Sequence, residues 1–218
     1  SLFLNYTDLE VGVNFPIRLV RKYDSRSEYD SAVGYGWSFA HDKRLFEYPD
    51  GSIVIRSGCG YRARFVLTGG AYVSASGDIA GQLFADSNGS YEFKHVDGAR
   101  DIYSPLGQLA AVIAPNGWRH EFTYAAGEQL PLIGTSPRAV DPNKPMLVAY
   151  LPRLTRIEER TRTGLQTGYH VDFTYNDTTG RLTGAIASDG RQLTYTHDVF
   201  SGATRGNLVS VTGLGNFS

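Results

Sequence analysis

The residues best suited to acid–base chemistry are a neighbouring histidine and aspartate, His41 and Asp42. An imidazole beside a carboxylate is a common arrangement for moving protons. If the two lie on a strand, however, their side chains point to opposite faces and cannot act on one substrate together. We therefore expect no catalysis at this pair and predict no enzymatic activity for the chain.

Metal and thiol chemistry are also disfavoured. None of the five histidines forms an H-x-H or H-x-x-x-H motif, so a metal site would need ligands from distant strands; they are His41, His95, His120, His170 and His197. The single cysteine, Cys59, excludes an intramolecular disulfide and looks like a turn residue between two glycines. We predict no metal and no cofactor, and expect the imidazoles to be hydrogen-bonded or to face solvent.

The segment Gly34-Tyr35-Gly36-Trp37 carries glycines, but lacks a third one at dinucleotide-binding spacing and precedes no helical pattern. Its glycines more simply allow a sharp turn, with Tyr35 and Trp37 packing on a neighbouring strand. Exposed aromatic rings can also bind sugars, and 14 Tyr, 11 Phe and 2 Trp supply many of them. Carbohydrate or partner binding is therefore an alternative, and a glycosidase with two carboxylates from distant strands is a third.

Length and charge exclude several classes of protein. The 218 residues suffice for one large β domain or two small ones. With 21 Lys and Arg against 22 Asp and Glu, no basic block indicates nucleic-acid binding. No apolar run approaches the roughly 18 to 20 residues of a membrane helix, and the start of the chain has no basic leader region. We expect a soluble chain without a membrane span, whose targeting signal lies outside it.

Turn signals predict the elements that position these residues. The chain has 25 glycines, and five Asp-Gly or Asn-Gly pairs match the preference of type I′ hairpin turns; they are Asp50-Gly51, Asn88-Gly89, Asp97-Gly98, Asn116-Gly117 and Asp189-Gly190. Alternating apolar and polar residues flank them, and 154–160 also alternates. We predict an all-β fold of consecutive antiparallel hairpins, forming a twisted open sheet or a partly closed barrel.

A repeat appears when the chain is aligned on its turns. Gly107-Gln108-Leu109 leads in ten residues to Gly117, and Gly180-Arg181-Leu182 leads in ten residues to Gly190. A third copy begins at Gly206-Asn207-Leu208, and we expect the chain to stop within its return strand. We divide the chain into an N-terminal β region (1–128), a proline-rich loop (129–147) and repeat hairpins (148–218).

The repeat resembles the tyrosine-aspartate (YD) repeat of Rhs proteins. The matching residues are Gly180-Arg181-Leu182, Asp189-Gly190-Arg191 and Leu193-Thr194-Tyr195, followed by His197-Asp198 where the family has Tyr-Asp. The N-terminal half resembles the opening region of Rhs cores in the order and spacing of its motifs; these are Phe15 to Ser25, Gly34-Tyr35-Gly36-Trp37-Ser38-Phe39, Arg44-Leu45 and Pro49-Asp50-Gly51-Ser52.

The resemblance implies a structural function. Rhs proteins, like the related toxin-complex components and teneurins, form spiralling β-shells, and bacterial members enclose a C-terminal toxin that is often delivered by type VI secretion. This chain would be a scaffold segment of such a shell in a secreted or cell-surface polymorphic toxin. Its partners would be the remaining repeats and the toxin domain, with glycans or secretion-apparatus proteins as further candidates. Some members also cleave themselves at an Asp-Pro motif, but Asp141-Pro142 lacks the following Gly-Leu, so that activity is not transferred.

Overall fold

The computed structural model describes residues 2–27, 29–77, 80–126, 153–198 and 207–214. These residues form nineteen strands and no helix, which confirms the all-β prediction. The strands are β1 (Phe3–Val11), β2 (Ile17–Asp24), β3 (Asp30–Ser31), β4 (Gly34–Tyr35), β5 (Trp37–Phe39), β6 (Arg44–Glu47), β7 (Ile53–Arg56), β8 (Arg62–Thr68), β9 (Ala71–Ser74), β10 (Gly81–Ala85), β11 (Tyr91–His95), β12 (Arg100–Tyr103), β13 (Leu109–Ile113), β14 (Arg119–Tyr124), β15 (Leu154–Arg160), β16 (Gln166–Tyr175), β17 (Leu182–Ala187), β18 (Gln192–His197) and β19 (Leu208–Leu214).

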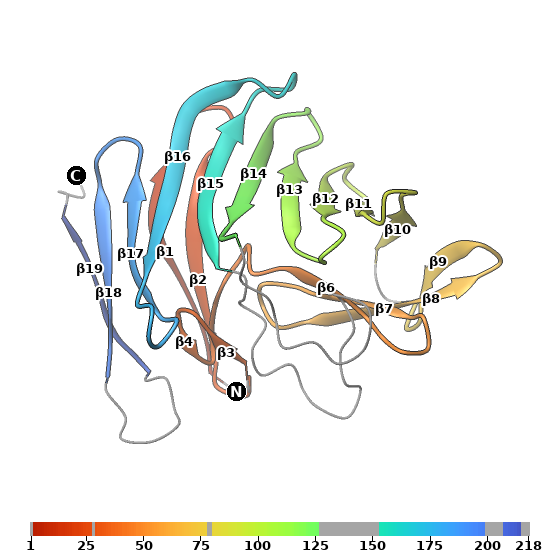
Figure 1. The fold of residues 1–218 in the computed structure, drawn as a ribbon, viewed down its shortest axis with the longest axis horizontal. Helices are drawn as coiled ribbons and strands as arrows, with labels where there is room; N and C mark the ends of the chain where they lie inside the picture. The colour runs from red at the N-terminus through yellow and green to blue at the C-terminus, as the bar shows by residue number, and fades with distance from the viewer. Residues whose placement is uncertain (1, 28, 78–79, 127–152, 199–206, 215–218) are drawn as a thin grey trace.

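Fourteen strands, β6 to β19, pair antiparallel in chain order in one open sheet, which we call the repeat sheet. Strands β1, β2 and β5 form a separate N-terminal sheet, and β3 and β4 form a small hairpin of their own. In Figure 1, β10 to β19 stand side by side while β6 to β9 run across beneath them. The sheet curls far enough for the Leu45 amide to donate to the Gly107 carbonyl (2.9 Å), yet its end strands β6 and β19 do not pair.

The five Asp-Gly and Asn-Gly pairs join consecutive strands, as predicted, but the prediction that they form type I′ turns is wrong. A type I′ turn needs positive φ at both central residues, whereas no described residue other than glycine has a positive φ. Gly98 has a φ of 88°, its amide donates to the His95 carbonyl (3.1 Å), and the Ala99 amide donates to the Asp97 carboxylate (2.9 Å). This is a type I turn followed by a glycine bulge.

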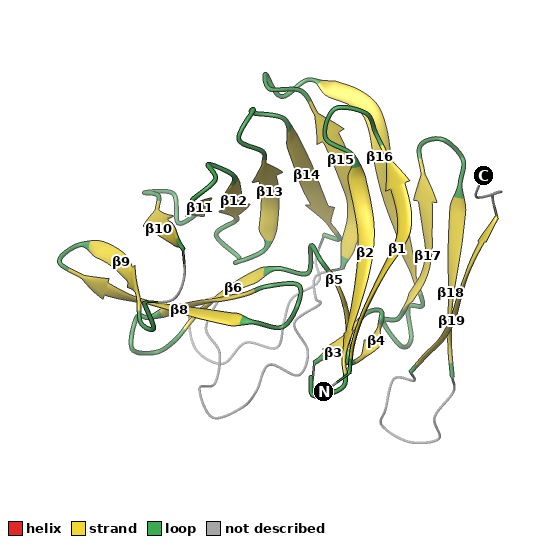
Figure 2. Cartoon of the chain, turned by 180° about the vertical axis from the view of Figure 1, so that it is seen from behind, coloured by secondary structure: helices red, strands yellow, loops and turns green. Residues whose placement is uncertain are grey.

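Two apolar cores stabilise the fold. The first lies between the N-terminal sheet and strands β15 to β18, and Leu19 and Val171 are completely buried in it. Figure 2 shows β1 and β2 covering this part of the repeat sheet. The second core lies within the curl from β6 to β13, around Leu45, Phe65 and Leu109.

The predicted loop 129–147 lies outside the described residues. The repeat sheet is continuous on either side of it, because β14 pairs with β15 from Arg119↔Arg160 to Tyr124↔Leu154.

Candidate functional site: the contact between the two sheets

The Gly-Tyr-Gly-Trp segment forms the tight connection between the small hairpin and the N-terminal sheet. Gly34 has a φ of 141°, and a Cβ there would lie 3.0 Å from the backbone nitrogen of Leu208 on β19. Gly36 has a φ of 74°, and a Cβ there would lie 2.9 Å from the ring of Tyr23. Both positions therefore require glycine, one for contact with the repeat sheet and the other within the N-terminal sheet.

The Gly-Arg-Leu segment before β17 is bound by the small hairpin. Arg181 is only 3% exposed, and its guanidinium donates to the Ser31 carbonyl. The Leu182 amide donates to the Ala32 carbonyl (2.8 Å), while the Leu182 side chain enters the first core. Buried backbone carbonyls need such partners, so these contacts fix the hairpin against the repeat sheet.

The tyrosine of the repeat completes a buried polar group. The Tyr195 hydroxyl donates to Asp8 Oδ2 (3.1 Å), and Arg21 donates to both oxygens of the same carboxylate (2.7 and 2.9 Å). All three side chains are at most one-tenth exposed. Burial, together with the neighbouring Asp8 charge, raises the pKa of Tyr195 well above its usual value, so the hydroxyl stays a donor.

The structure thus brings together some of the residues singled out from the sequence. Gly34 contacts β19, Arg181 and Leu182 contact the small hairpin, and Tyr195 contacts β1. Trp37 is half-buried and packs against Tyr23 with the rings tilted (5.0 Å between centroids).

Other predicted residues stay apart from this contact. Tyr35 is 49% exposed, so the expectation that it packs like Trp37 is wrong. Asp189 and Gly190 form the exposed turn between β17 and β18. Gly180 lies in the preceding turn, before β17, and also has a positive φ. Asp8 and Arg21 could not be predicted as part of this contact, because an isolated charged residue in a strand carries no signal that it is buried.

The side chains of the His41-Asp42 pair are half-buried. Burial, with smaller contributions from His120 and Lys43, lowers the pKa of His41 to about 3, so its ring is neutral. The ring stacks on Phe39 (5.0 Å between centroids). Burial raises the pKa of Asp42, whose carboxyl accepts the Phe39 amide (3.0 Å), while the Arg56 charge opposes that rise. His41 is half-buried, so the solvent-facing alternative applies to its imidazole only in part.

The other four histidines are hydrogen-bonded, as expected; their partners are Asp101 for His95, Phe15 for His120, Gly168 for His170 and Val33 for His197. Within the described ranges, no three His, Cys, Asp or Glu side chains gather as a metal site would require. The described residues also include no helix that could cross a membrane.

Cys59 is exposed and lies in the turn between β7 and β8, as the flanking glycines indicated. Partial burial alone would raise the pKa of its thiol, but hydrogen bonds, the Ser57 hydroxyl foremost, lower the pKa overall. The thiol borders a cavity of about 250 Å³ that Tyr23 and Tyr29 also line.

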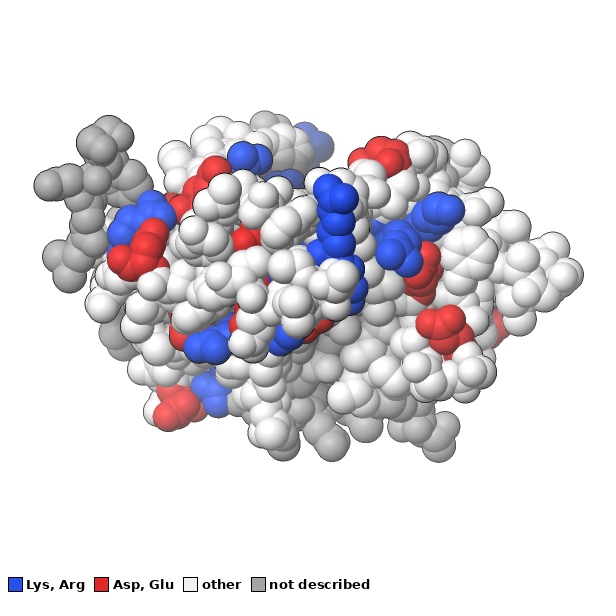
Figure 3. Space-filling model, turned by 90° about the horizontal axis from the view of Figure 1, so that it is seen from above, with Lys and Arg blue, Asp and Glu red and all other residues white. Residues whose placement is uncertain are grey.

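Charges on the surface are mixed in sign. On the face that Figure 3 shows, Lys and Arg side chains lie next to Asp and Glu side chains, without a broad area of one sign. Such a surface offers no basic strip for a nucleic acid on that face.

The first part of the chain matches a known family model. A family model described as "Domain of unknown function (DUF6531)" matches residues 1–65, which contain the N-terminal sheet, the small hairpin and β6 to most of β8. No curated protein matches the chain. The chain is therefore similar, over its first 65 residues, to a domain family that is itself described without a function.

Proposed function

We propose that this chain is a structural segment of an Rhs-type, YD-repeat shell. In this proposal the repeat sheet is a piece of the wall, and the N-terminal sheet covers one of its faces. The observation that carries the proposal is the contact of the small hairpin with the Gly-Arg-Leu segment, through Arg181 and Leu182. The match at residues 1–65 supports it, because DUF6531 is often found in Rhs and YD-repeat proteins.

The end of the repeat sheet also supports this proposal. Strand β19 pairs with β18 on one side and with no described strand on the other. An unpaired strand edge presents free amides and carbonyls to which another strand can pair. In the proposed shell, the next hairpin of the parent protein occupies this edge and extends the wall.

The partners and location of the chain follow from the same proposal. The wall would continue into the remaining repeats and would enclose or present a C-terminal toxin domain. A protein of this kind acts outside the cell or at its surface, so the proposed location is secreted or cell-surface. No catalytic step is assigned to the chain in this function.

Amide hydrogen exchange tests the continuation of the wall. We would compare residues 1–218 with the longer parent protein and follow the β19 amides that do not bond to β18. If the wall continues, these amides exchange rapidly in the shorter chain and are strongly protected in the parent. The central strand β16 has partners on both sides and serves as the internal control, since it should be protected in both. Equal exchange of the β19 amides in both proteins would contradict the proposal.

Binding of a carbohydrate or a cell-surface partner is a second candidate, favoured by one aromatic group. Tyr6 is 48% exposed, and its ring centroid lies 6.1 Å from that of Trp37. The guanidinium of Arg21 lies 4.6 Å from the centroid of the Trp37 ring. Sugar rings stack on such aromatic faces while their hydroxyls bond to neighbouring polar groups.

A glycan array followed by a fluorescence titration tests this candidate. A bound sugar should change the tryptophan emission, and Tyr6→Ala should abolish the change. Tyr61→Ala is the matched control, because Tyr61 is similarly exposed (50%) but lies in the turn before β8. Binding that survives Tyr6→Ala, or an array without any bound glycan, would reject this site.

A further inference from the structure

Two arginines face each other in the interior beside the contact between the sheets. Arg44 on β6 and Arg56 on β7 are direct cross-strand partners, so their side chains leave the same face of the sheet. They are only 6% and 2% exposed. Like charges at directly opposed positions repel, and burial strengthens the repulsion because water no longer screens it. Burial, with the Arg56 charge as a further cause, lowers the pKa of Arg44 to about 10.

Arg56 has donors that the described residues leave unused. Its guanidinium lies 3.6 Å from the centroid of the Tyr29 ring, and Nη2 donates to the backbone carbonyl of Asp42 (3.0 Å). Its Nε and Nη1 atoms are buried and have no hydrogen-bond partner among the described residues. A buried charged group with unused donors is unfavourable, and a bound anion would remove that penalty.

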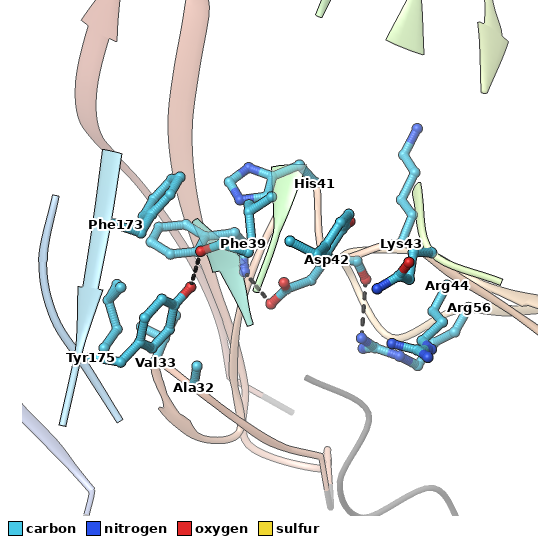
Figure 4. A pocket seen from close by; sticks show the side chains of 14 residues that line it. Ala32, Val33, Phe39, His41, Asp42, Lys43, Arg44, Arg56, Phe173 and Tyr175 are labelled. Carbon is cyan, nitrogen blue, oxygen red and sulfur yellow. Dashed lines mark hydrogen bonds between the residues drawn. The ribbon is translucent and has the colours of Figure 1, made fainter. Parts of the chain in front are cut away.

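Two carboxyl groups of this region, those of Asp42 and Asp101, already have other partners. The Asp42 carboxyl accepts the Phe39 amide, and in Figure 4 it lies on the Phe39 side while its backbone oxygen bonds to Arg56. The carboxylate of Asp101 accepts from Lys43 (2.7 Å) and His95 (3.0 Å).

A small cavity adjoins the two arginines. Its volume is about 40 Å³, and its lining includes Arg44, Arg56 and Gln108. At roughly 10–15 Å³ for each water-sized group, this space holds about three such groups. That is the size of a carboxylate group, and it is too small for a phosphate.

We infer that this cavity is a carboxylate-binding site in which Arg56 and Arg44 hold the anion. Guanidinium groups bind carboxylates through charge-assisted hydrogen bonds, so the unused donors of Arg56 match this ligand. The carboxylate has two possible sources. It belongs either to a small organic acid in solution or to an Asp or Glu side chain of a polypeptide that packs against this face.

Nuclear magnetic resonance of the arginine side chains tests the site directly. The ¹⁵Nε–¹H signal of Arg56, assigned by its loss in Arg56→Gln, is followed while sodium acetate, N-acetyl-glutamate amide, sodium phosphate or sodium chloride is added at equal ionic strength. We expect acetate or the glutamate derivative to shift the signal with saturation, and phosphate and chloride to leave it unchanged. Saturation by acetate identifies a site open to small acids, whereas saturation by the glutamate derivative alone identifies a side-chain carboxylate.

Variants provide the control. Acetate binding, measured from the other shifted signals, should weaken about tenfold or more in Arg56→Gln because a charge-assisted hydrogen bond is lost. Arg62→Gln should change it less than about twofold, since Arg62 faces Arg56 across β7 and β8 but is exposed. If Arg56→Gln fails to fold, the wild-type Arg56 signal is assigned by through-bond correlation to its backbone amide, and its titration decides alone. An unshifted signal with both carboxylates, an equal response to phosphate or chloride, or equal weakening in both variants would overturn the inference.

Discussion

Two buried tyrosines should respond in opposite directions to loss of their hydroxyl groups. Tyr195 and Tyr103 are 3% and 0% exposed, so each ring contributes fully to an apolar core. The Tyr195 hydroxyl donates to the carboxylate of Asp8 (3.1 Å). The Tyr103 hydroxyl is buried and has no hydrogen-bond partner within the described part of the chain. Replacing each by phenylalanine removes the same atom from two different electrostatic environments.

The expected magnitudes follow from those environments. A hydrogen bond to a charged group contributes about 1.5–3 kcal/mol, so Tyr195→Phe should lower the free energy of unfolding by about 2 kcal/mol. An unsatisfied buried hydroxyl costs about 1–3 kcal/mol, and the small void left by its removal offsets part of that cost. Tyr103→Phe should therefore change the free energy of unfolding by about 0 to +2 kcal/mol.

Urea denaturation and thermal unfolding measure both changes. At about 2–4 °C for each kcal/mol in a chain of this size, Tyr195→Phe should lower the melting temperature by about 4–8 °C, while Tyr103→Phe should leave it unchanged or raise it. The denaturant slope should stay constant in both variants, because neither changes the surface exposed on unfolding. Equal destabilisation of both variants would refute the reasoning that the Asp8 contact distinguishes them.

Two further predictions concern burial and backbone geometry. Because burial lowers the pKa of His41 to about 3, the unfolded chain binds a proton at this ring at a higher pH than the folded chain does. The free energy of unfolding should therefore be unaffected by this group above about pH 6.5, and should fall towards pH 3 by up to about 1.4 kcal/mol per pH unit. When the free energy of unfolding is measured as a function of pH, this loss should be reduced in His41→Gln and retained in His170→Gln. The same pH dependence in both variants would contradict the prediction. Gly36→Ala should cost about 2–4 kcal/mol because of its positive φ and its contact with the Tyr23 ring, whereas Gly190→Ala, whose Cβ would meet no atom, should cost about 1 kcal/mol in the same denaturation assay. Similar costs at both glycines would show that the contact has no effect.

Local signals predicted the hairpins but not their turn geometry. Asp97-Gly98 marks a turn because glycine accepts a positive φ and aspartate does not extend a strand well. The type I′ expectation neglected a second property of the pair. The Asp97 carboxylate accepts the amide two residues later, and this bond stabilises the turn while only the glycine needs a positive φ.

The separate N-terminal sheet could not be predicted from strand patterns. Alternation of apolar residues in Ile17–Asp24 indicates a strand with one buried face, but it does not identify the strands it will cover. That choice depends on contacts between distant residues, such as Asp8 with Tyr195. His41 illustrates the same limit, because its ring packs near Phe122 and Phe173, which are far away in the sequence.

The repeat units explain where the N-terminal segments lie. The first unit has Gly107 at a φ of 75° before the buried Leu109, and its Gly107 carbonyl accepts the Leu45 amide. The second unit has Gly180 at a φ of 70° before the buried Leu182, whose amide donates to an N-terminal carbonyl. The two units therefore share a glycine turn, a buried leucine and a backbone bond to an N-terminal segment.

The third unit extends this relationship. Leu208 begins β19, and its backbone nitrogen lies where a side chain on Gly34 would have to fit. Segments that precede the repeats thus touch the start of all three units at Leu45, Ala32 and Gly34. Because a one-residue slip of a strand would move each leucine to the opposite face, these contacts fix the register of the units as well as their position. The N-terminal motifs and the repeat motifs singled out from the sequence are therefore the two sides of the same contacts.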